Sequence, residues 1–391
     1  MPSRKFSVPS RLGLLLLAAS EISNAGGSVL TYVAPPGGEG AAAVALGVAL
    51  PCGLSSMEVN PALLAWEGDR TSSTVQYSSS SSDLIPELHE KNLDEKVRSV
   101  GLRYPIRPGT DVALGYSWNH VDLGQSRYAL LPGDSFQTLP GTAGETVHHV
   151  VLSGRLGGFA SVGIGWKLLD NRMAAGLVVD SGTPVHRTSW ASTWDLGILV
   201  APRWSIPKTP LRVGPSLGAS WINVADDSID YGLSNSRSPV ARVLRFGTAG
   251  ELSSPDVFSL QIFVDQETDL TDTAHGSSLQ YRGWSLDVLG IYRYSSAILD
   301  DPYGGRHEIQ VARQYTFDFK QLWRLKWRIQ HLDFGQSLGD APEDYPLPTF
   351  QVLGAALSPN IRILWTKSTI HDLYGTGVRE GQNRLGWAIS L

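Results

Sequence analysis

One stretch of the chain, Asp111–Val121 with the sequence DVALGYSWNHV, decides the fold because its apolar residues recur at every second position. Successive side chains of a β-strand point to opposite sides of the sheet, so alternate residues share a face. One face carries large apolar residues, namely Val112, Leu114, Tyr116 and Trp118. The other carries small or polar residues, namely Asp111, Ala113, Gly115, Ser117 and Asn119. The stretch therefore predicts a β-strand with one apolar face and one small, polar face.

The same alternation continues along the rest of the chain. Residues 97–106, VRSVGLRYPI, form a second such segment, and Arg107-Pro108-Gly109 supplies a turn signal between the two. Further segments lie at 160–168, 194–200 and 385–391. We count about 14 of them, many about 9 to 11 residues long, which is the length of a transmembrane β-strand.

Composition agrees with a folded β protein. The chain has 391 residues, of which 42% are hydrophobic and 18% charged, and a formal net charge of -5. This balance is too apolar for a disordered chain and indicates no nucleic-acid partner. Twelve tryptophans and 13 tyrosines favour strands over helical bundles. The single cysteine, Cys52, excludes a disulfide within the chain.

The N-terminus predicts export from the cytoplasm. Arg4, Lys5 and Arg11 precede the apolar run 12–19, and Ser23-Asn24-Ala25 has small residues where a signal peptidase cleaves. We expect residues 1–25 to be a cleavable signal peptide. The next apolar run, 41–50, is too short to cross a bilayer as a helix.

Two architectures use alternating strands in this number. A soluble sandwich buries its apolar faces in a core, whereas an outer-membrane barrel turns them to lipid and points its polar faces inward. Long strands, Gly and Ser on the polar faces, and Trp and Tyr near segment ends favour the barrel. We therefore expect an all-β, transmembrane, antiparallel outer-membrane β-barrel of about 14 strands.

The segment 307–333 predicts which charges line the lumen. A loop at 320–322 would set Phe319 opposite Trp323 and Asp318 opposite Arg324, with aromatic residues on one face and charges on the other. A basic residue on the lipid face costs about 2 to 4 kcal/mol at the bilayer midplane. We expect four lumen-lining charges, namely Asp318, Arg324, Lys326 and Arg328. Arg313 shares the aromatic face, and we expect it near a membrane interface.

Several motifs resemble the long-chain fatty-acid transporter (FadL-like) superfamily of outer-membrane barrels, and most closely its PorV-like branch. They are the leader GEGAAAVALGVALPCGLSSMEVNPALLAW, the pair WDLGILVAPRW and LRVGPSLGASWINV, and the hairpin GWSLDVLGIYRYSSAILDDPYGG. The resemblance covers most of residues 36–391. The chain departs from the family at Leu63, where glycine is frequent, and at Leu391, where an aromatic residue is usual.

The resemblance implies a division into a plug and a wall. Residues 26–70 correspond to a Gly/Ala-rich plug segment that runs through the barrel and contains the motif Asn60-Pro61-Ala62, and residues 71–391 to the transmembrane barrel. It implies passage of a fatty-acid-like hydrophobic molecule across the outer membrane, which leaves through a gap in the wall. The candidate plug or ligand residues are Asn60, Pro61, Leu63, Leu64 and Trp66, and they either contact a ligand or only pack the plug.

Two other functions remain open. PorV-like barrels are implied to be docking subunits of a protein secretion system at the cell surface, through loops such as 122–146 and 224–240. A lipid hydrolase is the third hypothesis, because Gly214-Pro215-Ser216-Leu217-Gly218 matches the nucleophile-elbow pattern. The alternation continues through this pattern, so we expect no catalytic residue and no enzyme.

We also expect no cofactor and no metal site. Glu87, His89 and Glu90, with the pair His148-His149, are of metal-ligating types, but a solvated loop and a strand start account for them. The expected partners are outer-membrane lipids, a hydrophobic small molecule, the barrel-assembly machinery and, in the docking alternative, secretion-system proteins.

Overall fold

The computed structural model describes most residues between 47 and 390. The gaps are 52–53, 55, 67–73, 84–92, 126–128, 132–134, 138–141, 173–188, 226, 231–236, 256, 272–277, 290–291, 301–309, 323–324, 337–348, 359–360 and 372–377. For strands β17 to β21 it gives the backbone register alone. The predicted signal peptide and the predicted boundary at residue 70 lie outside the described residues.

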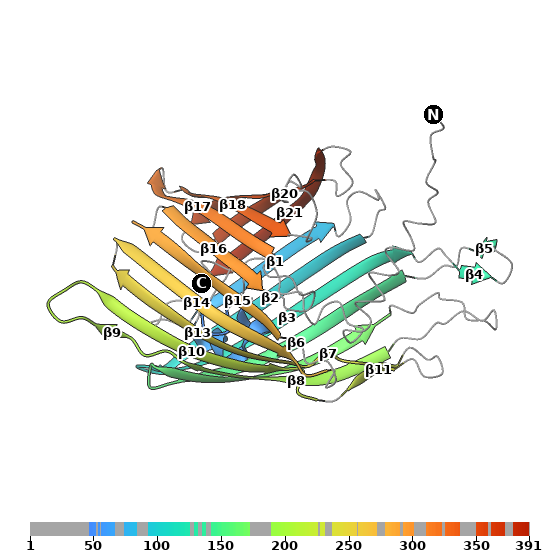
Figure 1. The fold of residues 1–391 in the computed structure, drawn as a ribbon, viewed down its shortest axis with the longest axis horizontal. Helices are drawn as coiled ribbons and strands as arrows, with labels where there is room; N and C mark the ends of the chain where they lie inside the picture. The colour runs from blue at the N-terminus through green and yellow to red at the C-terminus, as the bar shows by residue number, and fades with distance from the viewer. Residues whose placement is uncertain are drawn as a thin grey trace.

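Antiparallel strands account for most of the described chain (Figure 1), which confirms the all-β expectation. They are β1 (Thr74–Asp83), β2 (Leu93–Arg107), β3 (Thr110–Gln125), β4 (Ala129–Leu131), β5 (Ser135–Gln137), β6 (Thr142–Leu156), β7 (Ala160–Asn171), β8 (Ser189–Val200), β9 (Trp204–Ser205), β10 (Arg212–Ile222), β11 (Ser228–Asp230), β12 (Arg237–Pro239), β13 (Val243–Ser254), β14 (Phe258–Asp269), β15 (Ser278–Val288), β16 (Tyr292–Asp300), β17 (Gln310–Leu322), β18 (Leu325–Gln336), β19 (Thr349–Ser358), β20 (Ile361–His371) and β21 (Val378–Ser390). Two short helices, α2 (Ser56–Val59) and η2 (Pro61–Trp66), precede them.

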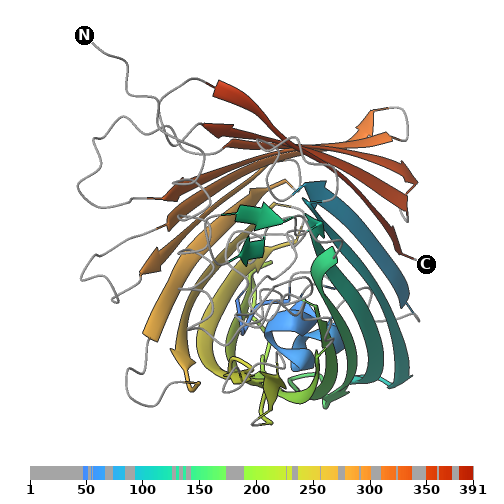
Figure 2. The same ribbon diagram turned by 90° about the vertical axis from the view of Figure 1, so that its right-hand side faces the viewer.

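The strands form a sheet that curls around the two helices (Figure 2). Neighbours in the sheet are mostly neighbours in sequence, and β21 also pairs with β1. Within the described residues the sheet has 17 strands, against the expected 14 or so. One of them, β9, has only two residues and is too short to show alternation. None of the described helices is long and apolar enough to cross a membrane.

The two ends of the barrel differ in the length of their connections. At one end, which we call the short-turn end, β2 and β3 are joined by residues 108–109, and β6 and β7 by residues 157–159. Gly109, Gly157 and Gly158 have positive φ there, a conformation that glycine adopts without steric cost. At the other end, the long-loop end, residues 172–188 join β7 to β8, and residues 223–242 join β10 to β13.

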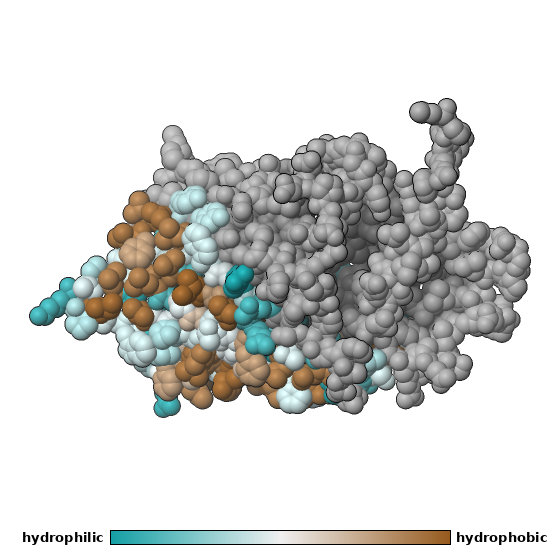
Figure 3. Space-filling model, in the orientation of Figure 1, coloured by the Kyte–Doolittle hydropathy of each residue, from teal (hydrophilic) through white to brown (hydrophobic). Residues whose placement is uncertain are grey.

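The barrel is apolar outside and polar inside. Leu114 and Leu152 each expose 50% of their surface on the outer face. The alternate positions of the same strands are buried and carry polar or charged side chains, among them Ser117, His149 and Ser153. Figure 3 shows apolar residues gathered on the outer surface near the end that carries β9. The polarity of the two faces is thus the reverse of that in a soluble sandwich.

The predicted hairpin register at 307–333 is wrong. Asp318 pairs with Arg328, not with Arg324, and Phe319 pairs with Trp327. β17 continues to Leu322, so residues 320–322 are not a loop. The observed register differs from the predicted one by four positions. Because side-chain direction repeats every two residues, both registers separate aromatic from charged residues equally well, and the pattern cannot distinguish them.

Candidate functional site

The described residues 47–66 form a plug inside the barrel, with α2 and η2 in the lumen (Figure 2). The helix η2 contacts β6, β7 and β8. The chain forms a 3-10 helix from Pro61 to Trp66, and all six of its residues are buried. Proline suits the first position of a helix because its missing N–H would have no partner there.

Asn60 joins three parts of the site through its side chain. Its Nδ2 donates to the carbonyl oxygens of Val48 (2.8 Å) and Ile198 (3.1 Å), and its Oδ1 accepts from the backbone N–H of Ala62 (3.0 Å). The last bond closes an Asx turn, which holds the chain as it enters η2. Asn60 thereby fastens two segments of the plug to the wall strand β8.

Two glycines in register on the wall make room for this turn. Gly163 of β7 pairs with Gly197 of β8. A Cβ added at Gly163 would overlap the backbone of Pro61, and one added at Gly197 would overlap Oδ1 of Asn60. Any larger residue at either position would therefore push the plug away from the wall.

Hydroxyl groups of the wall hold the C-terminal part of the plug. Ser161 and Ser153 both donate to the carbonyl oxygen of Ala62, at 2.8 and 3.2 Å. The indole Nε1 of Trp66 donates to Ser161 at 2.8 Å, and the guanidinium of Arg155 lies 5.0 Å from the indole ring centre. Trp66 is thus a packing and anchoring residue of the plug.

Ser216 contacts the plug and lies within a continuous strand. Its hydroxyl donates to the carbonyl oxygen of Ala49 at 3.0 Å. The neighbouring Gly218 lies against the backbone of Val48, where a Cβ would overlap it. Because β10 runs through residues 212–222 without the sharp strand-to-helix turn of a nucleophile elbow, the Gly-x-Ser-x-Gly pattern forms a plug contact.

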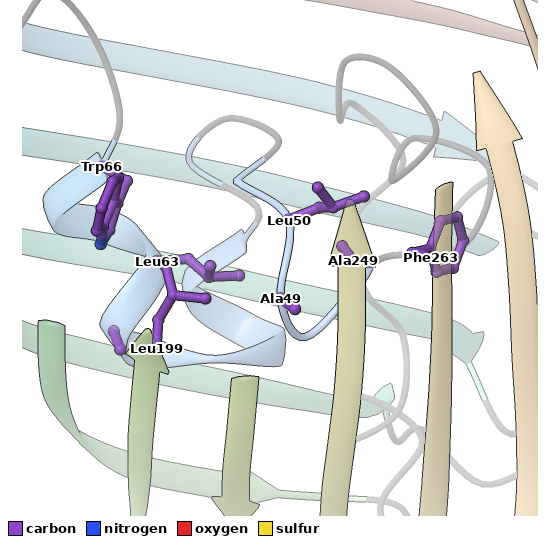
Figure 4. Close-up of a cluster of buried hydrophobic side chains, with 8 residues drawn as sticks. Ala49, Leu50, Leu63, Trp66, Leu199, Ala249 and Phe263 are labelled. Carbon is purple, nitrogen blue, oxygen red and sulfur yellow. The ribbon is translucent and has the colours of Figure 1, made fainter. Parts of the chain in front are cut away.

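The two candidate leucines lie in different apolar clusters. Leu63 packs with Trp66 in a cluster that we call the lumen cluster, whose members are Ala49, Leu50, Ala62, Leu63, Trp66, Leu199, Ala249 and Phe263 (Figure 4). Leu64 packs in a second cluster with Leu54, Met57, Ala65, Ala113 and Val151. It lies against the glycines of β2 and β3, namely Gly101 and Gly115. Leu63 and Leu64 are therefore packed in different places, although they are adjacent and identical in the sequence.

Glu58 of α2 and three buried residues of the wall form a network of charged or ionisable groups. His149 Nδ1 lies 2.9 Å from Glu58 of the plug, and His149 Nε2 lies 3.3 Å from Asp195 of the wall. Lys167 donates to Asp195 at 2.7 Å, and Ser117 donates to Glu58. Burial raises the pKa of Glu58, but attraction to His149 and Lys167 and hydrogen bonds from His149 and Ser117 outweigh it, so the pKa falls from 4.5 to about 2.

Acid is expected to loosen the plug through Glu58. Because the pKa in the docked plug lies below the ordinary value, the ionised carboxylate stabilises docking above pH 4.5, and this contribution is lost as the pH falls toward about 2. A pKa shift of this size corresponds to about 3 kcal/mol in the free energy of plug docking. Single-barrel conductance should therefore rise between these pH values, and Glu58→Gln should conduct already at pH 7. An identical pH response in Glu58→Gln would contradict this assignment.

The wall is interrupted between β8 and β10. β8 pairs with β10 as far as Val200 and Leu217, and pairing resumes where Trp204 of β9 faces Val213. Carrying the register across this gap places Pro202 opposite Pro215. Neither proline has an N–H to donate, so the ladder cannot continue between them. We call this interruption the proline break.

The proline break lies between the lumen cluster and the outer surface. On the inner side, Ala201 packs against the lumen cluster. On the outer side, Trp204 and Leu217 are 58% and 59% exposed. A cavity of about 240 Å³ adjoins the break and is lined by Arg203, Trp204, Ser205, Arg212, Val213, Gly214, Glu251 and Ser253. Arg203 pairs with Glu251 across it at 3.4 Å.

The structure brings together some of the site residues predicted from the sequence, but not all of them. Asn60, Pro61, Leu63, Leu64 and Trp66 all lie in the plug, at the wall contacts described above. The lumen-lining role of Asp318, Lys326 and Arg328 stays a prediction, because their side chains are not described, and Arg324 lies outside the described residues. Sequence reasoning missed Gly163, Gly197, Pro202 and Pro215. The two prolines could have been found from the sequence, since proline inside an alternating segment indicates an interrupted ladder.

The candidate metal ligands do not form a described site. Glu87, His89 and Glu90 lie outside the described residues. His149 faces the lumen, whereas its neighbour His148 contacts Tyr116 on the outer face, so the two imidazoles lie on opposite sides of the wall. Among the described side chains, no group of three His, Cys, Asp or Glu residues is arranged to hold a metal ion.

Neither a protein-family model nor a curated protein sequence matches the chain. Among solved structures it is similar to the toluene transporter TbuX of Ralstonia pickettii, with 12% identity and a TM-score of 0.46 over 92% of this chain and 99% of that one. It is similar to the toluene transporter TodX of Pseudomonas putida, with 11% identity and a TM-score of 0.41 over 90% and 97%. It is also similar to CdiB from Acinetobacter baumannii, with 9% identity and a TM-score of 0.50 over 82% of this chain and 60% of that chain's length. The likeness to CdiB concerns the fold alone.

Proposed function

We propose that the protein is an outer-membrane barrel of the FadL-like superfamily that passes hydrophobic small molecules from the lumen into the bilayer through the proline break. One observation carries this proposal. One of the apolar clusters inside the lumen adjoins the place where the wall ladder is interrupted. The cleavable signal peptide, the plug boundaries at 26–70 and insertion by the barrel-assembly machinery belong to the same proposal.

The polarity of the barrel supports its place in a membrane. In water, an outer face with contiguous apolar side chains would be an aggregation hazard, whereas in lipid it is solvated. Buried charges such as Asp195 and Lys167 are paired with each other inside the lumen, away from the lipid. Short turns at one end and long loops at the other are the usual arrangement, with the short turns on the periplasmic side.

The lumen cluster supplies what a hydrophobic ligand needs. Such a molecule gains nothing from the polar lumen wall and requires a local apolar pocket and a side exit. Leu63, Leu50 and Trp66 of the plug face Leu199 and Phe263 of the wall in this cluster (Figure 4). A ligand that displaces Leu63 would reach Ala201 and then the break, without crossing the charged network of Glu58, His149, Lys167 and Asp195.

Leu63 and Leu64 form a matched pair for testing this route. We expect Leu63→Asn to lower the uptake of labelled oleate by cells that produce the protein about tenfold, since a polar group in the apolar pocket costs about 1 to 3 kcal/mol. Leu64→Asn, in the second cluster, should leave uptake within about twofold of the original protein. Heat-dependent migration on a gel would verify that both barrels are folded.

Two results would contradict the route through Leu63. Equal losses in both variants would mean that the leucines only pack the plug. Oleate uptake no greater than that of cells without the protein would refute the transport function itself.

A docking role is the second candidate, because the described part of one long loop packs against the wall. Within residues 223–242, β11 pairs with β12, and Ile229 and Val240 are buried against Val147, Leu169 and Ala191 of the wall. A surface that receives a protein partner gains from being preorganised in this way. Stoichiometric protein partners recovered with the barrel from outer membranes would favour docking, and their absence together with oleate uptake would favour transport.

A further inference from the structure

Four side chains at neighbouring positions on the outer face of the wall supply one guanidinium, two imidazoles and one indole ring. Arg98 of β2, Trp118 of β3 and His148 of β6 are direct cross-strand neighbours. The guanidinium carbon of Arg98 lies 5.2 Å from the centre of the Trp118 ring. His120, two residues further along β3, stacks on the same indole at 5.4 Å. We call these four residues the outer basic cluster.

Each imidazole of the outer basic cluster is oriented by a hydroxyl group. The hydroxyl of Tyr116 lies 2.9 Å from Nδ1 of His148, and that of Thr146 lies 2.8 Å from Nδ1 of His120. A hydroxyl that donates to Nδ1 fixes the proton of the neutral ring on Nε2. In that tautomer each histidine has an N–H donor at Nε2.

The outer basic cluster lies at the border of the apolar outer face. On the short-turn side of the cluster the exposed residues are apolar, namely Val100, Leu102, Leu114, Val150 and Leu152. On its other side the strands run toward the long-loop end. In the cross-strand row of His120, Asp170 of β7 is paired with Arg172 at 2.8 Å. Lipid headgroups lie at the edge of the apolar face of a barrel, which is where these donors are found.

We infer that the outer basic cluster binds the phosphate group of an outer-leaflet lipid. A guanidinium and two imidazole N–H groups within one cross-strand neighbourhood match the oxygens of a phosphate, and hydrogen bonds to an ionised group are about twice as strong as neutral ones. The adjoining apolar face would accommodate the acyl chains of the same molecule, which a free phosphate ion lacks. This inference rests on the proposed membrane location but not on the transport of hydrophobic molecules.

Native mass spectrometry of the detergent-purified protein with a diphosphorylated lipid A tests the inference. We expect the double variant Arg98→Gln/His148→Gln to bind this lipid about tenfold more weakly, through the loss of charge-assisted hydrogen bonds. Arg107→Gln is the matched control, because Arg107 is an exposed arginine of the same strand at the short-turn end, where it bonds Thr110. Unchanged binding in the double variant, or an equal loss in Arg107→Gln, would overturn the inference.

A second arm separates the headgroup from the acyl chains. The original protein should bind lipid A without phosphates weakly, about as weakly as the double variant binds the phosphorylated form. If the original protein binds both lipids equally well, the inference is also overturned. The single variant His148→Phe keeps the ring and removes the donor, and is used if the double variant loses its heat-dependent gel shift. Oleate uptake by the double variant should stay at the original level, so a failure of transport and a failure of lipid binding are distinguishable.

Discussion

Cells that produce the double variant Pro202→Val/Pro215→Thr are expected to take up labelled oleate roughly tenfold more slowly than cells with the original barrel. Both replacements restore a backbone N–H where the ladder between β8 and β10 is interrupted. Each restored hydrogen bond contributes about 1 kcal/mol, so two would shift an opening of the wall toward the closed state by tenfold or more. Valine and threonine also suit a strand.

A proline in the nearby connection provides the control for this prediction. Pro210 lies between β9 and β10 and outside the interrupted ladder, so Pro210→Thr should leave uptake unchanged. The folded state of each variant is verified by its gel shift. Undiminished uptake in the double variant, with the barrel intact, would place the exit elsewhere in the wall.

The second large effect is expected from Gly197→Val, which should dislodge the plug and open the lumen to polar solutes. The added Cβ overlaps Oδ1 of Asn60, and the nearby plug backbone at Ala62 leaves little room for the side chain to adjust. The hydrogen bond from Asn60 to the carbonyl oxygen of Ile198, worth about 1 kcal/mol, is lost when the plug moves away from the wall. We expect a labelled sugar to enter liposomes that contain the variant and to be excluded by the original protein.

Gly154→Val is the matched control for the plug prediction. Gly154 is also a wall glycine, but a Cβ added there meets no atom within 4 Å. The control should therefore exclude the sugar as the original protein does. Exclusion of the sugar by Gly197→Val as well would show that the plug tolerates the side chain, and that the two paired glycines do not hold it in place.

The alternation of apolar residues predicted the sheet and its faces because side-chain direction depends only on odd or even position. Strand register is not determined by odd or even position alone. A shift of four residues in the hairpin of Asp318 and Arg328 leaves every side chain on the same face, so the pattern carries no information about it. The interruption between Pro202 and Pro215 was missed because each segment was interpreted separately, and only their pairing places the two prolines together.

The plug was predictable in location but not in its contacts. The motif Asn60-Pro61-Ala62 was expected in the plug, yet its partners are glycines and serines of the wall, about 100 residues or more further along the chain. Small residues on a lumen face are compatible with many neighbours, so Gly197 by itself predicts none of them. Leu63 and Leu64 are adjacent and chemically identical, and only tertiary packing assigns them to different clusters.

The shared bonds of Asn60 also determine how the plug can leave. One side chain joins Val48, the start of η2 and the wall at Ile198, so none of the three can separate without loss of a hydrogen bond at the same amide. Partial unravelling of the segment is then disfavoured relative to release as a unit. Recordings of a single barrel should show abrupt switching between two current levels, without intermediate levels.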